Sequence, residues 1–428
     1  MLFNQTLTYI SLFSGAGVGC YGLLEEGFEC VATNEILEKR LNIQRINRKC
    51  KLDESYISGD IKKPETKEKI LKQIEFYSKK FGNDRVDLVV ATPPCQGMSV
   101  ANHKKKNDEI KRNSLVIESV DLIKQIKPRF FILENVPSFY KTGCIDKNDN
   151  LLEIGSMIEQ NLSGDYTLYD EVINFKNFGA NSSRTRTLVI GVCKEFKDFT
   201  SALEFFPDFK QEKTLKEVIG SLKPLSWGEY DSADFYHSFR TYPKHMQEWI
   251  KDLKEGQSAF ENVQDAISDL AYLCSNEGAF ESDYLNPIQS SYQALMRKDS
   301  PKLYNHQATN HSQAALEKLK LINKEQGKEC LPKNLHGKQQ FKSTWGRLNW
   351  NKISPTIDTR FDTPSNGTNS HPELHRSITP REAARIQSFS DDYIFYGNKT
   401  SVCKQIGNAV PPLLALALGK AILKSLRK

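Results

Sequence analysis

The stretch Tyr9–Gly19 reads YISLFSGAGVG, a short apolar run that ends in a glycine-rich turn. Glycine residues let a backbone turn sharply and approach a ligand closely. Glu35 follows Gly15 by 20 residues and ends a second apolar run, where a carboxylate can accept hydrogen bonds from ribose hydroxyls. The pattern is GxGxG and lacks the full GxGxxG of dinucleotide-binding loops. It indicates a nucleoside cofactor, and a turn that is merely glycine-rich is the alternative.

Further short apolar runs follow along the chain. Each is bounded by turn residues and rich in β-formers, as buried parallel strands are. These runs are Cys30–Thr33, Val86–Ala91, Phe130–Leu133 and Leu188–Val192. Ser114–Ile126, which precedes Phe130–Leu133, carries apolar residues near helical spacing. Strand, helix and strand in sequence predict an α/β fold with a Rossmann-like, doubly wound sheet.

The C-terminal part of the chain predicts two helices. Thr379-Pro380-Arg381-Glu382 is a capping box with proline at the first helical position, so we expect helix from Arg381 to Phe389. Pro412–Leu426 is typical of a final helix, apolar enough to pack against the sheet.

Composition excludes several classes of protein. The 428 residues are 39% apolar and 26% charged, which is an ordinary globular balance. The longest apolar stretch, Pro411–Leu418, is far shorter than the roughly 20 residues that span a bilayer. Neither a basic secretory signal nor a CxxC pair occurs, so no zinc site or disulfide framework is indicated and the nine cysteines are typical of reduced thiols in a cytosolic protein.

Charge is distributed unevenly along the chain. Ser201–Ser290 carries 16 acidic against 8 basic residues, whereas Arg297–Arg347 carries 11 basic against 4 acidic residues. The basic stretch also holds His306, His311 and Trp345. It is typical of a surface for a phosphate backbone, with a solvated lysine-rich face as the alternative.

Chemically useful side chains follow the predicted strands. Pro93-Pro94-Cys95 comes directly after Val86–Ala91, which places a thiol at the carboxyl edge of the sheet, where open α/β sheets bind ligands. Glu134 ends another apolar run, so partial desolvation should raise its pKa and let it act as an acid. Arg184 and Arg186 would point to one face of an extended segment. The alternatives are a core cysteine, a capping carboxylate and an exposed basic pair.

Taken in order, these motifs resemble those of the cytosine-5 DNA methyltransferases. The resemblance covers Tyr9–Gly191 and Arg347–Leu418. The matching segments are Phe13–Gly19, Asn34-Glu35, Gly59-Asp60-Ile61, Pro93–Gln96, Glu134-Asn135-Val136, Arg184-Thr185-Arg186, Arg347, Ser354–Ile357, Arg381–Gln387 and Gln405–Pro411. Two positions depart from the family's QxRxR segment, because Asn181 and Ser182 stand where proline and glutamine are usual.

The resemblance implies a reaction and roles for particular residues. S-adenosylmethionine would donate a methyl group to cytosine C5 in double-stranded DNA, after the base is flipped out of the duplex, and no metal is expected. The implied catalytic residues are Cys95 as nucleophile, Glu134 as donor to N3, Arg184 as contact to the base carbonyl and Arg186 in support. The implied cofactor residues are Phe13, Ser14, Gly15, Gly17, Gly19, Glu35, Asp60, Ile61, Pro93 and Asn408.

We expect DNA contacts from the loop Gly97–Arg112 and from the basic stretch. The candidates are Ser99, Lys104, Lys105, Lys106 and Arg347, with base contacts in Ser291–Trp345. The resemblance divides the chain into catalytic residues 1–194, a smaller target-recognition domain at 195–346, and a return to the catalytic domain at 347–428.

A stand-alone enzyme of this kind would be a cytoplasmic bacterial monomer whose genetic partner is a restriction endonuclease. A tRNA cytosine-5 methyltransferase, which has similar motifs, is the second interpretation. The third is an inert DNA-binding regulator, against which the intact Cys95 and Glu134 argue. A NAD-dependent enzyme is supported only by the first loop.

Overall fold

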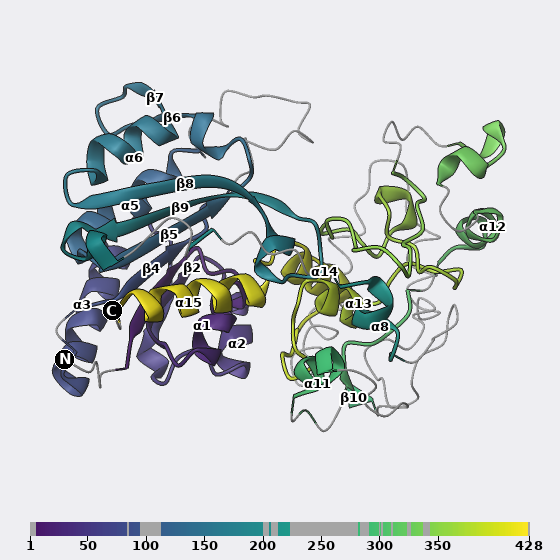
Figure 1. Cartoon of the computed structure of the whole chain (residues 1–428), viewed down its shortest axis with the longest axis horizontal. Coiled ribbons are helices and arrows are strands. Elements are labelled where there is room, and N and C mark those ends of the chain that lie inside the picture. The colour runs from purple at the N-terminus through teal and green to yellow at the C-terminus, as the bar shows by residue number, and fades with distance from the viewer. Residues whose placement is uncertain are drawn as a thin grey trace, which may run out of the picture.

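The computed structural model describes most of the chain in two lobes (Figure 1). The described residues are 6–83, 85–94, 113–199, 205–206, 213–222, 281–282, 291–298, 300, 303–309, 311–322, 327–336 and 343–426. Cys95, Ser99 and Lys104 to Lys106 therefore lie outside the described residues, as does nearly all of the acidic stretch Ser201–Ser290.

The larger lobe is built on a 7-stranded sheet of order β3-β2-β1-β4-β5-β9-β8. In that order the strands are Tyr56–Ser58, Glu29–Glu35, Thr8–Leu12, Leu88–Ala91, Phe130–Asn135, Thr185–Cys193 and Tyr166–Asn174. Strands β1 to β5 pair in parallel, and β9 pairs antiparallel with both β5 and β8. The predicted doubly wound α/β sheet is confirmed. Strands β3 and β8 were not predicted from the sequence.

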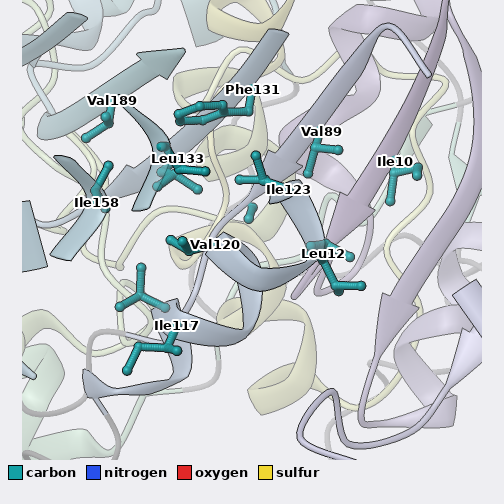
Figure 2. Close-up of a cluster of buried hydrophobic side chains, with 14 of the residues drawn as sticks. Ile10, Leu12, Val89, Ile117, Val120, Ile123, Phe131, Leu133, Ile158 and Val189 are labelled. Atoms are coloured by element: carbon teal, nitrogen blue, oxygen red, sulfur yellow. The ribbon is translucent and has the colours of Figure 1, made fainter. Parts of the chain in front are cut away.

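One face of the sheet is covered by α3 (Pro64–Phe81), α5 (Leu115–Ile126) and α6 (Ile154–Leu162). Alternate strand residues such as Ile10, Val89 and Phe131 point to this face and pack in one cluster with Val120 and Ile123 of α5 (Figure 2). The same buried set supports the carboxyl ends of β1, β4 and β5, where the predicted site residues follow.

The opposite face is covered by α1 (Tyr21–Glu25) and by α15 (Pro412–Leu426). Helix α15, yellow in Figure 1, thus packs on the sheet as predicted. The stretch Lys399–Leu426 is long and apolar enough to cross a membrane by length and composition, but its most apolar window is 61% buried inside the protein. That burial is typical of a core helix.

The smaller lobe contains short helices from the second half of the chain. They are α8 (Leu215–Ile219), α11 (Ser291–Arg297), α12 (Gln313–Leu321), α13 (Pro380–Ile386) and α14 (Lys399–Gly407). Two-stranded pairs are formed by β6 (Gly143–Ile145) with β7 (Leu151–Glu153) in the larger lobe, and by β10 (Glu281–Ser282) with β11 (Leu303–Tyr304) in the smaller one.

One hydrophobic cluster joins this lobe to the loop after β1. It contains Ala16 and Val18 from that loop, Leu215 and Met296 from the middle segment (residues 195–346), and Ile357 from the return segment (residues 347–428). The middle segment therefore shares its buried core with residues on both sides of it. The division at residues 194 and 346 stays a prediction.

The capping box at Thr379 is confirmed, because its side chain accepts from the Glu382 amide and the Glu382 carboxylate accepts from the Thr379 amide. The helix ends at Ile386, earlier than the expected Phe389. Ser388 has a φ of 68°, in the left-handed region, so the chain leaves the helical conformation there.

Candidate active site and cofactor pocket

The glycine-rich loop leaves β1 and is fixed by the carboxylate at the end of β2. Phe13, Gly15 and Gly17 have φ values of 53°, 54° and 88°, so the loop turns through left-handed backbone. The Gly15 amide donates to Glu35 Oε2 (2.9 Å), and the Leu37 amide donates to Glu35 Oε1 (3.2 Å). Each carboxylate oxygen keeps lone pairs beyond these contacts. Glu35 can therefore hold the loop and still accept from ribose hydroxyls.

The loop has room for a ligand on one side. A Cβ built at Gly15 would meet nothing within 4 Å, whereas one at Gly17 would lie 2.6 Å from Gln44 Cγ. Gly19 instead faces the return segment, where an added Cβ would lie 3.3 Å from Val410 Cβ. Open space beside Gly15 and a carboxylate at Glu35 fit a nucleoside cofactor.

The third strand supplies the next predicted cofactor residues. Asn34 Nδ2 donates to Ile57 O (3.0 Å) and Gly59 O (3.2 Å), which ties the end of β2 to the turn after β3. Asp60 accepts from the Lys62 amide (3.0 Å) and is partly exposed. Ile61 is 3% exposed and packs in the core, so its backbone is the part that could face a ligand.

Hydrogen bonds join the ends of the central strands. Thr92 Oγ1 donates to Phe13 O (3.1 Å), and Asn135 Nδ2 donates to Pro93 O (2.9 Å). The segment that leads into Cys95 is therefore tied both to the glycine-rich loop and to the residue after Glu134. Pro94 is the last described residue before Cys95.

Glu134 and Arg186 lie side by side in the site. Arg186 Nε lies 3.2 Å from Glu134 Oε1. Burial raises the pKa of Glu134, while the positive charges of Arg186 and Arg184 oppose part of that rise. Glu134 pairs with Leu188 across β5 and β9, so alternation puts Arg186 on the same face of the sheet. The expected shift of Glu134 is confirmed in direction.

Arg184 lies differently from Arg186. Its Nη1 donates to Ile357 O (3.3 Å) and to Gly407 O (3.1 Å), and the residue is 7% exposed. Arg184 thus joins β9 to the return segment, whereas the guanidinium beside Glu134 belongs to Arg186. The sequence predicted that Arg184 contacts the base and that Arg186 supports it, but Arg186 is the arginine whose guanidinium lies beside Glu134. The role of Arg184 in binding the base stays a prediction.

Asn181 and Ser182, the departures from QxRxR, dock the arginine segment onto the turn after α13. Asn181 Nδ2 donates to Arg385 O (2.8 Å), and the Asn181 amide donates to Ser388 Oγ (3.2 Å). Ser182 forms a bridge with Ser354 and lies 3.5 Å from Gln387 Oε1. Asn181 and Ser182 therefore hold the chain in place just before Arg184, although proline and glutamine are usual at these two positions.

Arg347 does not lie where a DNA contact was expected. The residue is 6% exposed, and its guanidinium donates to the carbonyls of Leu319, Ile322, His371 and Leu374 at 2.6–2.9 Å. Donors directed at buried carbonyls leave little to bind a phosphate. The structure therefore assigns Arg347 to the support of the smaller lobe.

Two histidines of the basic stretch are buried, although Lys320, Lys333 and His336 of the same stretch are exposed. His306 and His311 are 2% and 7% exposed, and burial lowers the pKa of His311 to about 4. His306 Nδ1 contacts Thr379 Oγ1 (3.0 Å), and His311 Nε2 accepts from the Ser377 amide (2.9 Å). These two histidines dock the middle segment onto the start of α13 and are not presented for base contacts.

The return segment contacts the glycine-rich loop. Tyr393 Oη donates to Ala16 O (2.7 Å), and Asn408 is exposed at the end of α14. An exposed amide at that end, beside the Val410 contact to Gly19, is consistent with the predicted cofactor role of Asn408.

Two buried polar residues behind the loop were not predicted from the sequence. Gln44 is 0% exposed and Lys49 is 4% exposed. Helix α2 (Glu38–Ile46) buries Gln44 together with the apolar Leu41 and Ile43. The signal in the sequence was a glutamine among the apolar positions of this helix, which no motif marks. Within the described residues, no group of three or more His, Cys, Asp or Glu side chains could hold a metal ion.

Comparison with known proteins shows which family the sequence matches. The model of the family described as C-5 cytosine-specific DNA methylase matches residues 7–424. The chain is 30% identical over 357 residues to the type II methyltransferase M.DdeI of Desulfomicrobium norvegicum, covering 79% of this chain and 72% of that protein. It is 26% identical to the type II methyltransferase M1.HphI of Haemophilus parahaemolyticus, covering 99% and 88%.

A solved structure shares the fold. The crystal structure of a prophage-encoded DNA modification methyltransferase of E. coli superposes with a TM-score of 0.66, covering 99% of this chain and 100% of that one. Sequence identity to it is 22%, so the likeness concerns the fold alone.

Proposed function

Because the chain belongs to the C-5 cytosine-specific DNA methylase family, we propose that it methylates C5 of one cytosine within a short double-stranded DNA sequence, with S-adenosylmethionine as methyl donor. Family membership makes it a DNA (cytosine-5)-methyltransferase related to those of type II restriction–modification systems. The observation that carries the proposal is the buried Glu134 beside Arg186, at the strand end that is tied to the segment before Cys95.

The proposed reaction begins with Cys95. Cytosine C5 is a poor nucleophile, and addition of a thiolate at C6 makes it enamine-like. The new C6–S bond forms as N3 takes a proton from Glu134, so the ring does not accumulate negative charge. Burial favours the neutral, proton-donating form of that carboxyl.

Arg186 would hold the base and Glu134 together. Its guanidinium contacts Glu134 through Nε and donates to Thr185 O through Nη1 (2.7 Å), and Nη2 would donate to the base carbonyl oxygen. Arg184 fixes β9 against the return segment. Bound S-adenosylmethionine supplies the electrophilic methyl group. Transfer of the C5 proton to a base, cleavage of the C6–S bond and return of the N3 proton to Glu134 then restore the aromatic ring, the Cys95 thiolate and the protonated acid.

The cofactor would lie along the glycine-rich loop. Gly15 faces open space, Glu35 would accept from the ribose, and Asp60 would accept from the adenine amino group. Phe13 would lie beside the adenine, while Pro93 and Asn408 would border the pocket. A glycine loop without the complete dinucleotide pattern suits a cofactor that has no pyrophosphate.

Attack at C6 from above the ring requires the target base to leave the duplex stack, at a cost of a few kcal/mol. We therefore infer base flipping, with Lys104 to Lys106 on phosphates of the DNA. Methylation of this kind would protect the host's own sites from a cognate restriction endonuclease.

The decisive experiment is bisulfite sequencing of DNA from a methylation-free bacterial host that expresses the protein. Protected cytosines in one fixed context support the proposal, and a Cys95→Ala variant should protect none. Soluble protein that binds S-adenosylmethionine yet protects no cytosine would contradict the DNA substrate. Methylation of tRNA in a parallel assay would then identify the alternative substrate. DNA carrying 5-fluorocytosine tests the adduct, since fluorine cannot leave as a proton and the C6–S bond persists.

A further inference from the structure

The glycine-rich loop rests on a buried glutamine that lies outside every matched motif. Gln44 is 0% exposed on α2. Its Nε2 donates to Ser14 Oγ (2.7 Å) and to Gly15 O (2.7 Å), and its Oε1 accepts from Thr33 Oγ1 (2.7 Å). Both amide hydrogens are thus directed at the loop. The side chain holds two successive loop residues at once.

The same loop residues are also held by the end of β2. Ser14 Oγ donates to Asn34 O (3.1 Å), and the Gly15 amide donates to Glu35 Oε2 (2.9 Å). The Gly15 carbonyl accepts from Gln44, so both polar groups of this residue are oriented by side chains. A change at Gln44 should therefore release the Gly15 carbonyl while the Gly15 amide keeps its hydrogen bond to Glu35.

The path of the Gln44 side chain explains the glycine at position 17. Gly17 has a φ of 88°, and an added Cβ there would lie 2.6 Å from Gln44 Cγ and 3.2 Å from Lys49 Cδ. Only a residue without a side chain lets these two groups pass beneath the loop in this conformation. The buried side chain of Gln44 therefore requires a glycine at position 17.

The orientation of the Gln44 amide is set by a buried lysine. Lys49 is 4% exposed, and its Nζ donates to Thr33 Oγ1 (3.1 Å). An ammonium group donates only, so Thr33 accepts from Lys49 and directs its own hydrogen to Gln44 Oε1. The carbonyl of Gln44 must then face Thr33, and its NH2 group must face the loop.

We propose that Gln44, oriented through Lys49 and Thr33, is a positioning residue that holds Ser14 and Gly15 in the conformation that binds S-adenosylmethionine. The inference rests on the proposed function, because it assumes that cofactor. Without the amide donors the loop would sample other conformations, and ordering it on binding would cost affinity. Loss of two buried hydrogen bonds predicts an affinity for S-adenosylmethionine weaker by about 10-fold or more.

The test measures the Kd of S-adenosylmethionine by calorimetry on the full chain. Gln44→Leu removes every polar contact of the side chain. Gln73→Leu is the matched control, because Gln73 is also buried, at 6% exposed, and donates to Ser55 Oγ (3.0 Å) on a different element. We expect Gln44→Leu to raise the Kd by about 10-fold, with kcat at saturating cofactor within about twofold of wild type. Gln73→Leu should leave the Kd unchanged.

A pH series separates positioning from general loss of structure. In Gln44→Glu the carboxyl can donate to Gly15 O only when protonated; burial favours that form and the nearby Lys49 ammonium opposes it, so the ratio of its Kd to that of wild type should fall as the pH falls from about 8 to about 5. Gln44→Leu should show no such trend. If Gln44→Leu does not fold, the Gln44→Glu series alone decides, and a wild-type Kd throughout it overturns the inference.

The outcomes distinguish this inference from the proposed function. Wild-type protein that binds S-adenosylmethionine, together with a folded Gln44→Leu of unchanged Kd, overturns the role of Gln44 alone. An equal loss of affinity in Gln73→Leu does the same. Wild-type protein that fails to bind S-adenosylmethionine overturns the proposed cofactor, and with it this inference.

Discussion

Arg186 Nε lies 3.2 Å from Glu134 Oε1, although burial raises the pKa of that carboxyl. The arginine opposes part of the shift without cancelling it. A partly desolvated acid beside a fixed cation can release its proton to a base and then be stabilised as a carboxylate. The geometry thus suits a group that changes protonation during turnover.

The first prediction concerns catalysis by Glu134. Replacing it by glutamine keeps the shape and a hydrogen-bond donor but removes the transferable proton. We expect Glu134→Gln to lower the single-turnover rate of methyl transfer by about 100-fold or more. The Kd for S-adenosylmethionine, measured in parallel, should stay within about twofold if the effect lies in the chemistry. A rate within about threefold of wild type would exclude Glu134 as the donor.

The second prediction concerns stability and pH. Because burial raises the pKa of folded Glu134 above the roughly 4.3 of an unfolded chain, protonation favours the folded state. The contribution of protonated Glu134 to the free energy of unfolding is fully present below the pKa of the unfolded chain, and it is lost as the pH rises through the pKa of the folded protein. Glutamine cannot titrate, so the Tm of Glu134→Gln minus that of wild type should grow from about pH 5 to about pH 8. A difference that stays constant would contradict the raised pKa.

The third prediction separates the two arginines of β9. Arg186→Ala removes the cation beside Glu134 and should lower kcat by about 100-fold with little change in Tm. Arg184→Ala removes the donor to the carbonyls of Ile357 and Gly407 and should cost about 2 kcal/mol of stability. Thermal unfolding and single-turnover rates of both variants test this together. The opposite pattern would return the base contact to Arg184.

Sequence reasoning predicted the parts of the fold whose pattern is local. The parallel strand Leu88–Ala91 is a continuous apolar run, the strand Phe130–Asn135 begins with one at Phe130–Leu133, and the Thr379 capping box involves residues three positions apart. Strand β8 has a mixed burial pattern, because it lies at the edge of the sheet, and no apolar run marks it. Edge strands carry little of the signal that central strands carry.

Site residues that directly follow a strand could be predicted from the sequence. Residues whose role depends on contacts between distant segments could not. Glu134 follows an apolar run, so its burial could be inferred. The burial of Arg347 could not, because the carbonyls that bind it come from Leu319, Ile322, His371 and Leu374. Gln44 was missed for a similar reason, since its partners at Ser14 and Gly15 are brought to it by the fold.

The fourth prediction follows from the position of Arg347. Arg347→Met should cost about 3 kcal/mol of stability, because several buried carbonyls lose their donor. Binding of the folded variant to DNA should keep its salt dependence. Replacing Lys104 to Lys106 with alanine should instead reduce the slope of log K against log salt by about 0.9 for each phosphate that the protein no longer neutralises. An unchanged slope in the lysine variant would contradict the phosphate contacts of Lys104 to Lys106. A reduced slope in Arg347→Met would contradict the structural role of Arg347.

The fifth prediction concerns the buried ion pair that holds the start of α13. Burial alone would raise the pKa of Glu382, but Arg376 contacts both carboxylate oxygens at 2.8 Å and lowers it to about 2. Both residues are at most 2% exposed, so removing one charge leaves the other buried without its partner. We expect Arg376→Met to cost about 3–5 kcal/mol.

The pH dependence of that pair has the opposite sign to that of Glu134. A lowered folded pKa contributes stability that is present above the unfolded value of roughly 4.3 and is lost as the pH falls toward 2. The double variant Arg376→Met, Glu382→Leu removes both charges and should recover part of the stability lost in Arg376→Met, because no buried charge remains unpaired. Chemical denaturation at about pH 7 compares the variants. If the double variant is no more stable than Arg376→Met, the uncompensated charge is not the source of the loss.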